Sequence, residues 1–550
     1  MKTKRTVACI FGLAFLCQLL LQPSCKKDVA TVDPVYLSVN LPRSVFRNET
    51  YYSLSHTERS IELDFSQPID TTTIPGNISF THKGGPLELM YTTIASGRKV
   101  ILALKDDATL HTGWKYMITV KKGLRSVSGA TLQSDAAIEL RTTAKQLGVE
   151  NDTNVRNSIV CISDIHLGDQ RAVARGYCWF SKNKTALESL LDLVISGTQV
   201  RQLVILGDLF DEWVIPYRFS PFDTAAGVAS SRDYFLSVAN SPVNTGIINK
   251  LRTIAAGGAV QLIYVPGNHD MLLTQEIITE IIPGVIWMGD SAGLGHYSPS
   301  GEMIMEHGHR YDFFNCPQPF VKPGHILPPG YFVSRMDAEG LLESGSHKRK
   351  ETNSVGSDFE FKAAWAASME YLKIKYALQV ASDSANILMR GVDNYAVPFS
   401  FNGARDMYAG NIEEVWPATQ IRNAVPVSMP VLAAIINGNV DLYQAAAGQF
   451  MQTQSPVKYK IVAFGHTHIP MVKVYPAGNN YTGIYANTGS WVNAELTSKA
   501  VRTFLVIKPA AWTGSDLDVV SLYQYNLDSG SGNPNPGYIP VLVSEESISM

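Results

Sequence analysis

Apolar and polar residues alternate along the first part of the chain, from about residue 34 to residue 146. Every second position is apolar in segments 61–65, 100–104, 114–120 and 138–140, and turn-forming stretches such as "KGG" and "VSGA" separate the segments. Successive side chains of a strand point to opposite faces of a sheet, so this pattern predicts half-buried strands. We therefore expect an all-β sandwich over residues 34–146.

From residue 158 the pattern changes to short, continuous apolar runs: "SIVCIS", "QLVILG", "QLIYVP", "MIMEHG" and "KIVAFG". Such runs are typical of strands in a sheet that is covered on both faces. Between the first two runs, Leu187, Leu190, Leu191 and Val194 recur at helical spacing. The order strand, helix, strand predicts an α/β fold in which helices flank the sheets.

A long interruption, residues 317–455, separates "EHGHRYD" from "AFGHTH". It contains the polar stretch "SGSHKRKETNSVGSD" and a stripe of five apolar residues at helical spacing, which is the pattern of core packing. That stripe consists of Phe361, Trp365, Met369, Leu372 and Tyr376. We expect a largely helical cap inserted into the α/β domain, because a separate third domain would have to leave and re-enter the same sheet. Residues 511–550 are expected to form C-terminal strands and a tail.

The N-terminus has the form of an export signal, since basic residues precede an apolar run from Val7 to Leu21. The run is short for a membrane span and predicts a signal peptide over residues 1–24. The sequence "SCKKD" resembles the cleavage box of bacterial lipoproteins, although Gln22 departs from the usual small or aliphatic residue. We expect Cys25 to be lipidated and residues 25–33 to tether an exported protein to a membrane, at the periplasm or the cell surface. A plain cleaved signal or an uncleaved anchor are the alternatives.

Composition places the rest of the chain among ordinary globular proteins. Apolar residues make up 45% of the 550 positions and charged residues 17%, which suits several folded domains. Without residues 1–24 the basic count falls from 46 to 43 against 49 acidic residues, a net charge of −6. This balance gives no reason to expect a nucleic-acid partner. The cysteines left for a folded exported chain, Cys161, Cys178 and Cys316, are too few for a disulfide framework.

Five short polar motifs each follow one of the apolar runs, at the strand ends where α/β sheets place their sites. They are "SDIHLGD" with Asp164 and His166, "LGDLFDEW" with Asp208, "PGNHD" with Asn268, His269 and Asp270, "EHGHRYD" with His307, and "AFGHTHIP" with His466 and His468. A single motif of this kind is usually a surface turn. Five in order, each beside glycine or proline, make coincidence improbable and indicate a metal site built from oxygen and imidazole ligands.

The five motifs resemble those of the calcineurin-like metallophosphoesterases, over about residues 155–510 apart from the insertion. The resemblance implies a phosphoesterase-type β-sandwich flanked by helices. It implies that Asp164, His166 and His468 hold one metal ion, that Asn268, His307 and His466 hold a second, and that Asp208 bridges the two. Mixed Asp, Asn and His ligands suit Mn, Fe, Zn or Co. The strands before residue 146, with "IELDFSQPIDTTTIPGNISF" and "LHTGWKYMITVKKGLRSVSGATL", resemble bacterial Ig-like domains, which mostly act as spacers.

The resemblance implies hydrolysis of phosphomonoesters, phosphodiesters or pyrophosphates by a hydroxide that bridges two metal ions. Two dications about 3.5–4 Å apart clamp phosphoryl oxygens and lower the pKa of water between them. In the family, the histidine corresponding to His269 faces the leaving group. The alternative is that His269 only hydrogen-bonds to Asp270.

Several further residues are secondary candidates. Asp169, Asp211 and Asp270 are candidates to orient the ligand imidazoles. His309 is either a substrate contact or a partner behind the ligands. Arg171, Arg310 and Arg335 are either phosphate contacts or ordinary solvated side chains.

The motifs "GDLFDEW", "GNHD" and "HGH" are similar to the branch that contains UDP-2,3-diacylglucosamine pyrophosphohydrolases. The expected export and the size of the insertion both depart from that branch, so the substrate stays open as a small-molecule or lipid-linked phosphate ester. Two other functions compete with the enzyme. One is a surface binding or display lipoprotein with a degenerate phosphoesterase fold, and the other is a nuclease, which the acidic balance disfavours.

Overall fold

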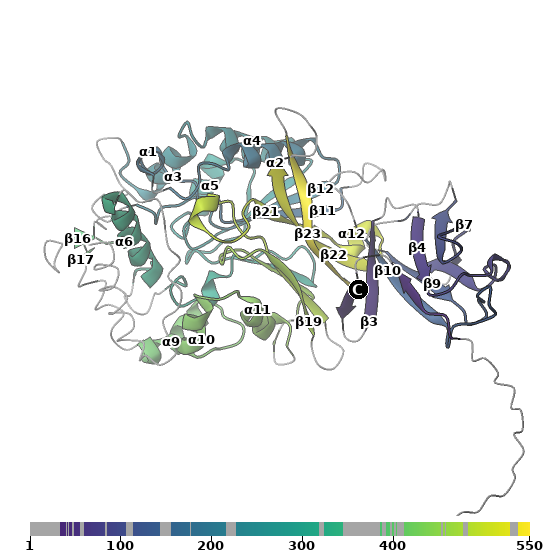
Figure 1. Cartoon of the computed structure of the whole chain (residues 1–550). Coiled ribbons are helices and arrows are strands. Elements are labelled where there is room, and N and C mark those ends of the chain that lie inside the picture. The colour runs from purple at the N-terminus through teal and green to yellow at the C-terminus, as the bar shows by residue number, and fades with distance from the viewer. Residues whose placement is uncertain are drawn as a thin grey trace, which may run out of the picture.

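The computed structural model describes residues 33–143, 156–344 and 386–549 with interruptions, of which the longest are 216–226, 404–411 and 528–536. An all-β region and a larger α/β region lie side by side (Figure 1). The predicted signal peptide and the tether from Cys25 lie outside the described residues, as does the predicted stripe from Phe361 to Tyr376. Among the described residues, no helix combines the length and apolar character that crossing a bilayer would require.

Two packed sheets form the all-β region. One has the order β1 (Leu37–Val39), β4 (Ser60–Phe65), β8 (Lys99–Leu104), β7 (Leu89–Ile94). The other has the order β2 (Arg43–Phe46), β3 (Glu49–Ser55), β10 (Ala136–Thr143), β9 (Lys115–Val120), β5 (Ile78–His82), β6 (Gly85–Pro86). Burial alternates residue by residue along β4, β8 and β9, and the inward side chains form one apolar core. The predicted β-sandwich is therefore confirmed.

Two further sheets face each other in the α/β region. The larger has the order β14 (Ile286–Trp287), β13 (Gln261–Val265), β12 (Val200–Leu206), β11 (Ser158–Ile162), β21 (Thr503–Lys508), β22 (Leu517–Leu527), β23 (Tyr538–Ser549). The smaller has the order β15 (Met303–Met305), β18 (Ile461–Phe464), β20 (Thr482–Asn487), β19 (Met471–Pro476). Apolar side chains from both sheets, among them Cys161, share one core. The continuous apolar runs are thus strands that are buried on both faces.

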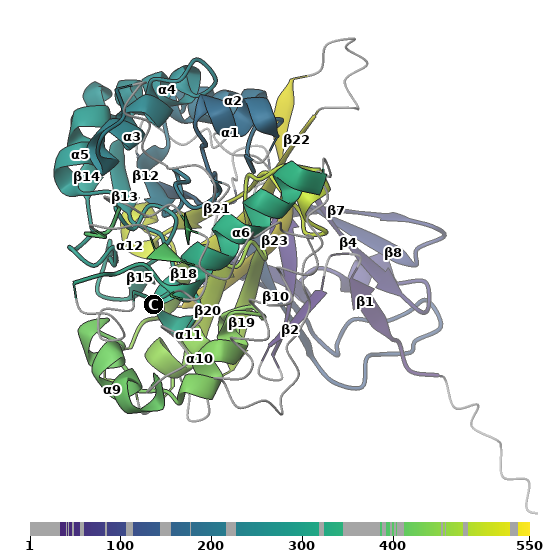
Figure 2. The same cartoon turned by 90° about the vertical axis from the view of Figure 1, so that its left-hand side faces the viewer.

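Helices cover the outer faces of both sheets, which gives the four layers visible in Figure 2. Buried side chains of α2 (Lys184–Ser196), α3 (Ser231–Ala239), α4 (Thr245–Gly257) and α5 (Gln275–Ile281) pack against the larger sheet. Short α1 (Gln170–Arg175) follows the first strand, and α12 (Ala510–Thr513) precedes β22. On the smaller sheet, α11 (Tyr443–Phe450) packs against β18 and β20. The predicted α/β class with flanking helices is confirmed.

Residues after 510 include two of the expected C-terminal strands, β22 and β23. Strand β22 pairs antiparallel with β21, and β23 pairs antiparallel with β22, so both extend the larger sheet. The first seven residues of β22 are buried, because this strand lies inside the sheet and not at its edge. Both strands therefore belong to the α/β region.

The described parts of the insertion do not all act as a cap. Helix α11 forms part of the core beneath the smaller sheet, and α9 (Ile412–Arg422) and α10 (Val431–Asn437) lie beside it. Helix α6 (Pro329–Ser344) crosses the side of the molecule that faces the viewer in Figure 2. A short hairpin, β16 (Asn386–Ile387) with β17 (Phe399–Ser400), completes the described insertion. The predicted largely helical character fits these segments.

Polar contacts join the all-β region to the far end of the larger sheet. Lys115 Nζ donates a hydrogen bond of 2.8 Å to Ser549 Oγ. His82 lies 3.6 Å from Asp516 and stacks on Trp114 at a ring distance of 4.1 Å. These contacts are at the opposite end of the strands from the polar motifs, and no described residue of the all-β region contributes a side chain to the site described next.

Candidate active site

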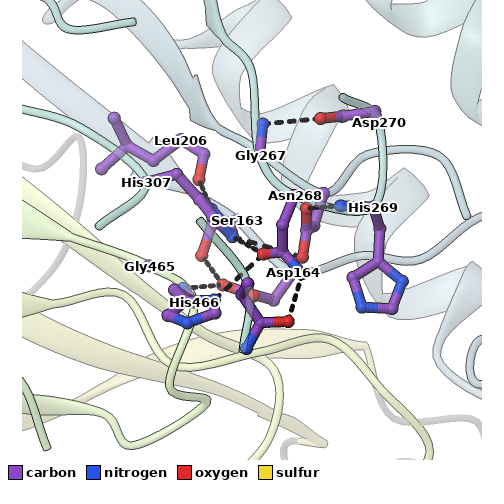
Figure 3. Close-up of polar contacts among 12 residues, drawn as sticks. Ser163, Asp164, Leu206, Gly267, Asn268, His269, Asp270, His307, Gly465 and His466 are labelled. Carbon is purple, nitrogen blue, oxygen red and sulfur yellow. Dashed lines mark hydrogen bonds and ion pairs between the residues drawn. The ribbon is translucent and has the colours of Figure 1, made fainter. Parts of the chain in front are cut away.

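The five polar motifs converge at one end of the two facing sheets. Each motif begins where a strand ends, after β11, β12, β13, β15 and β18, and these strands bring their carboxyl ends to the same edge. Figure 3 shows Asp164, Asn268, His307 and His466 gathered within one cluster, with His269 to one side. All of these side chains are at least nine-tenths buried. Motifs that lie far apart in the sequence thus form one compact group of side chains in the fold.

The backbone at these strand ends is left-handed at most of the candidate ligands. The φ angles are +51° at Asp164, +58° at His166, +54° at Asp208, +70° at His466 and +57° at His468. Non-glycine residues rarely adopt this conformation, and they do so mainly where surrounding contacts fix them at functional sites. In an extended strand two histidines one residue apart in "GHTH" would face opposite ways. The left-handed turn directs both imidazoles into the same site.

Glycines next to the candidate metal-binding residues allow the strand ends to approach each other closely. A Cβ atom at Gly267 would collide with the Asp208 carboxylate, and one at Gly207 would collide with the imidazole of His307. Gly207 also has φ +83°. The "GD" and "GN" pairs of the motifs therefore keep space for the ligand side chains.

Three residues that we expected to hold one metal form the first group. His468 Nε2 lies 3.1 Å from Asp164 Oδ1 and 3.2 Å from His166 Nε2. His166 Nε2 lies 4.0 Å from Asp164 Oδ1 and 3.8 Å from Asp208 Oδ2. Ligands of one ion with bonds of about 2.0–2.2 Å lie roughly 3–4 Å apart. The first group has this spacing.

The second group consists of Asn268, His307 and His466. Asn268 Oδ1 lies 3.0 Å from His307 Nε2 and 3.0 Å from His466 Nδ1. His307 Nε2 lies 3.2 Å from Asp208 Oδ2, the same oxygen that approaches the first group. The structure therefore places Asp208 between the two groups.

The outer nitrogens of three of the four candidate ligand imidazoles have partners in the protein. His166 Nδ1 lies 3.2 Å from Asp211 Oδ2, His307 Nδ1 lies 2.6 Å from the carbonyl oxygen of Leu206, and His466 Nε2 lies 3.0 Å from Asp312 Oδ2. These partners accept hydrogen bonds, so each of these three outer nitrogens carries a proton, and each inner nitrogen offers a lone pair once the imidazole is neutral.

With the imidazoles neutral, as metal binding requires, the inner atoms of both groups are acceptors that face one another. Lone pairs of imidazoles point at carboxylate and amide oxygens, and buried Asp164 Oδ1 accepts no hydrogen bond from any described residue. Acceptors confronted in this way repel one another unless a cation lies among them. The donor set of imidazole and oxygen therefore fits transition-metal ions of the Mn, Fe, Zn or Co type.

Neighbouring charges keep the carboxylate of Asp208 ionised. Burial opposes ionisation of Asp208, but the charges of His307 and then His269 lower its pKa well below the usual value. Burial lowers the pKa of His307, whereas the Asp208 carboxylate raises it, with a net rise to about 9. A metal ion bound at His307 Nε2 must therefore displace a proton.

His269 lies beside the first group, where we expected it to face a leaving group. Its Nδ1 is 2.8 Å from Asp211 Oδ1, and its backbone N–H donates to Asp208 Oδ1 at 2.9 Å. Its ring stacks on Trp213 at 4.5 Å and meets His166 edge to face at 4.6 Å. Asp211 holds Nδ1, so Nε2 is the atom that remains for chemistry at the site.

Asp270 does not contact His269 through its carboxylate, so the alternative of a His269–Asp270 hydrogen bond does not match the structure. The Asp270 carboxylate accepts from the N–H groups of Gly267 at 2.6 Å and Leu209 at 3.2 Å, and from the hydroxyl of Tyr264. Burial and the Asp208 charge raise its pKa to about 6. Asp270 fixes the loop backbone and does not orient an imidazole.

Of the other two expected orienting residues, Asp211 contacts both His166 and His269, as described above. Asp169 instead caps helix α1 by accepting from the N–H of Ala172 at 2.7 Å, and it pairs with Arg171 at 2.6 Å. A residue at a helix N-terminus gains more from capping than from a distant ring, which explains the difference.

Arg310 and Arg335, which were candidates for phosphate contacts or for solvated side chains, are both buried. Arg310 is buried and forms an ion pair of 2.7 Å with Glu306, and its guanidinium also donates to the carbonyl oxygen of Ala424 at 3.1 Å. Arg335 is buried and donates to the hydroxyl of Tyr331 at 3.2 Å. His309 is buried near His307, with a ring distance of 5.3 Å, and its ring nitrogens bond to no described residue.

We expect Arg310→Ala to destabilise the fold without weakening substrate binding. The substitution leaves the buried Glu306 carboxylate without its cation, which costs about 3–5 kcal/mol of unfolding free energy. Denaturant unfolding and steady-state kinetics would measure the two effects separately. Arg232→Ala, which removes an exposed pair with Glu280, is the matched control and should change stability little. A large rise in KM with unchanged stability would restore the phosphate-contact role.

Sequence reasoning missed two polar residues of the site, Asp312 and Asn315, and the aromatic ring of Trp213. Asp312 is the last residue of the motif "EHGHRYD", so an acidic residue five positions after a ligand histidine was the available signal. Trp213 is likewise the last residue of the motif "LGDLFDEW". Asn315 carries no signal of its own, because its role depends on how the chain folds after β15.

Two family models match parts of the chain. Residues 158–352 match the model of the calcineurin-like phosphoesterase family, and residues 38–142 match that of a bacterial Ig-like domain. The chain carries a calcineurin-like phosphoesterase domain. The matched part of the phosphoesterase domain contains Asp164, His166, Asp208, Asn268, His269 and His307. The "GHTH" motif lies beyond its end, and the sheet pairing of β18 with β15 brings that motif to the same site.

Solved structures add little to these matches. The N-terminal part of the bacterial S-layer protein SbsC is 24% identical over 20% of this chain and 27% of its own, with a TM-score of 0.15. CopC from Methylosinus trichosporium OB3b is 16% identical over 19% of this chain and 89% of its own, also with a TM-score of 0.15. The chain thus spans about a quarter of the S-layer fragment, and similarities this small say nothing about its function. No curated protein matches the chain.

Proposed function

We propose that the protein is an exported, metal-dependent hydrolase of phosphoric esters that uses two metal ions. The phosphoesterase domain supports the reaction class. The observation that carries the proposal is that buried carboxylate and amide oxygens lie close to imidazole nitrogens in two groups that share Asp208. Asp164, His166 and His468 would hold one ion, and Asn268, His307 and His466 the other. When bound, such ions act as Lewis acids on phosphoryl oxygens and lower the pKa of water at the site toward about 7.

The side chains of the protein then position the ester and move a proton. The side chain of His468 is 21% exposed, whereas those of Asp164, His166 and His307 are fully buried. The ester would therefore approach from the side of His468 and His269. Nε2 of His269, oriented through Asp211, would donate a proton to the departing oxygen or stabilise its charge.

As substrate we propose a small-molecule or lipid-linked phosphate ester, which is a monoester, a diester or a pyrophosphate. The predicted signal peptide and the expected lipidation of Cys25 support a location at a membrane outside the cytoplasm. The Ig-like domain suits an extracellular or surface protein. It also favours the second candidate function, a surface binding lipoprotein, but a degenerate site would not need to keep all seven metal-ligating side chains.

Removal of metal should abolish the activity. Dialysis against a chelator is expected to reduce hydrolysis of an aryl phosphate or a bis-aryl phosphate to the background rate, and added Mn²⁺, Zn²⁺ or Co²⁺ should restore it. Metal content measured on the same samples should rise and fall with the rate. A metal-free preparation that keeps full activity would contradict the proposal, and a metal-loaded protein inactive on mono-, di- and pyrophosphate esters would favour the surface binding function.

A further inference from the structure

Asp312 and Asn315 connect two candidate ligands of the second group from behind. Asp312 Oδ2 accepts from His466 Nε2 at 3.0 Å and also from the side-chain amide of Asn315. Asn315 Oδ1 in turn accepts from Asn268 Nδ2 at 3.2 Å. A continuous line of hydrogen bonds therefore runs from His466 through Asp312 and Asn315 to Asn268.

Each bond in this line selects one of two chemically different orientations. An imidazole that gives its Nε2 proton to a carboxylate keeps its lone pair at Nδ1, and Nδ1 of His466 is the atom that faces Asn268 Oδ1. A side-chain amide has nearly the same shape when it is flipped. Because Asn268 donates its N–H to Asn315, its oxygen must point toward His307 and His466.

The insertion holds this line in place. The chain turns sharply after His307 through a short 3₁₀ helix, residues 309–311, and leads directly into the insertion. Helix α10 makes two hydrogen bonds with this turn. The N–H of Phe313 donates to Ala434 O at 3.1 Å, and Asn437 Nδ2 donates to Tyr311 O at 2.9 Å. At the start of α6, the N–H of Gly330 donates to Phe314 O at 2.6 Å.

We propose that Asp312 and Asn315 are positioning residues that set the metal affinity of the second group, and that the insertion helices α6 and α10 hold them in register. The inference rests on the proposed function, because it assumes that Asn268 and His466 bind a metal ion. In the first group, His166 is oriented by a different residue, Asp211. The described contact of this group with the line is the backbone N–H of His466, which donates to Asp164 Oδ2 at 3.0 Å and does not involve the side chains of Asp312 or Asn315. Loss of Asp312 or Asn315 therefore acts on one metal position only.

Titration of the metal-free full-length protein with Zn²⁺ or Mn²⁺ against a competing chelator tests this inference without any use of activity. The wild type should bind two ions. Asp312→Ala and Asn315→Ala should weaken binding of the second ion about 10–100-fold and leave the first unchanged, as is typical when the partner behind a ligand is removed. Asp312→Asn should lose less than Asp312→Ala, because the amide oxygen can still accept from His466.

Asn439→Ala removes an exposed asparagine just after α10 and is the matched control, with two ions bound as in the wild type. Wild-type affinity for both ions in all three site variants would overturn the inference. An equal loss of affinity for both ions would also overturn it, because that result would indicate a general structural role. If Asp312→Ala does not fold, Asp312→Asn and Asn315→Ala decide the outcome. A wild-type protein that binds fewer than two ions would instead overturn the proposed function, and the inference with it.

Discussion

Replacement of Asp208 by alanine is expected to reduce phosphoesterase activity to the background rate. Its carboxylate oxygen Oδ2 lies 3.8 Å from His166 Nε2 and 3.2 Å from His307 Nε2, so one substitution removes a ligand from both groups. It also removes the acceptor for the backbone N–H of His269, at 2.9 Å. We expect both metal content and kcat to fall, measured by elemental analysis and by turnover of an aryl phosphate on the same preparation.

Asp192→Asn is the matched control for Asp208→Ala. Asp192 is an exposed carboxylate on α2 that pairs with Lys250, away from the strand ends, and its loss should leave metal content and turnover at wild-type values. If Asp208→Ala hydrolysed esters at the wild-type rate, the assignment of this site would be wrong.

Replacement of His269 by alanine is expected to lower kcat about 10²–10⁴-fold while the protein keeps its metal ions. His269 reaches the site between Trp213 and His166 but belongs to neither group of proposed metal ligands. Its loss should therefore remove proton donation to the leaving oxygen and little else. The deficit should be smaller for esters with acidic leaving groups, which depart without a proton, and a series of aryl phosphates would measure this trend.

The exposed His296, which lies outside every motif, provides the control, and His296→Ala should behave as the wild type. Metal content and the series of aryl phosphates separate the possible roles of His269. Metal loss in His269→Ala would mean that this side chain is a ligand, which its position within 4.8 Å of His166 and Asp208 also permits. An equal deficit for all leaving groups would contradict the proton-donor role.

Much of the fold could be predicted, because burial leaves a local pattern in the sequence. Alternation along β4 and β9 reports one buried face, and the continuous run in β11 reports two. The order of strands in a sheet has no such local signal. Strand β11 pairs with β12 and also with β21, which follows the entire insertion, and the sequence pattern could not predict that β22 and β23 continue the same sheet.

The candidate site could be predicted at the level of residue types but not of contacts. His166 and Asp208 stand directly after apolar runs, so their motifs marked a strand end. The role of Arg310 could not be predicted in this way, because its partner Glu306 is chosen by the turn that follows β15. Asp312 was likewise recognisable as an acidic residue, whereas its bond to His466 depends on the meeting of β15 and β18.

Anomalous diffraction from crystals of the metal-loaded protein tests the central claim most directly. Two separate peaks are expected, one among Asp164, His166 and His468 and the other among Asn268, His307 and His466, with the Asp208 carboxylate between them. A single peak, or peaks bound by other side chains, would contradict the account of a shared two-metal site.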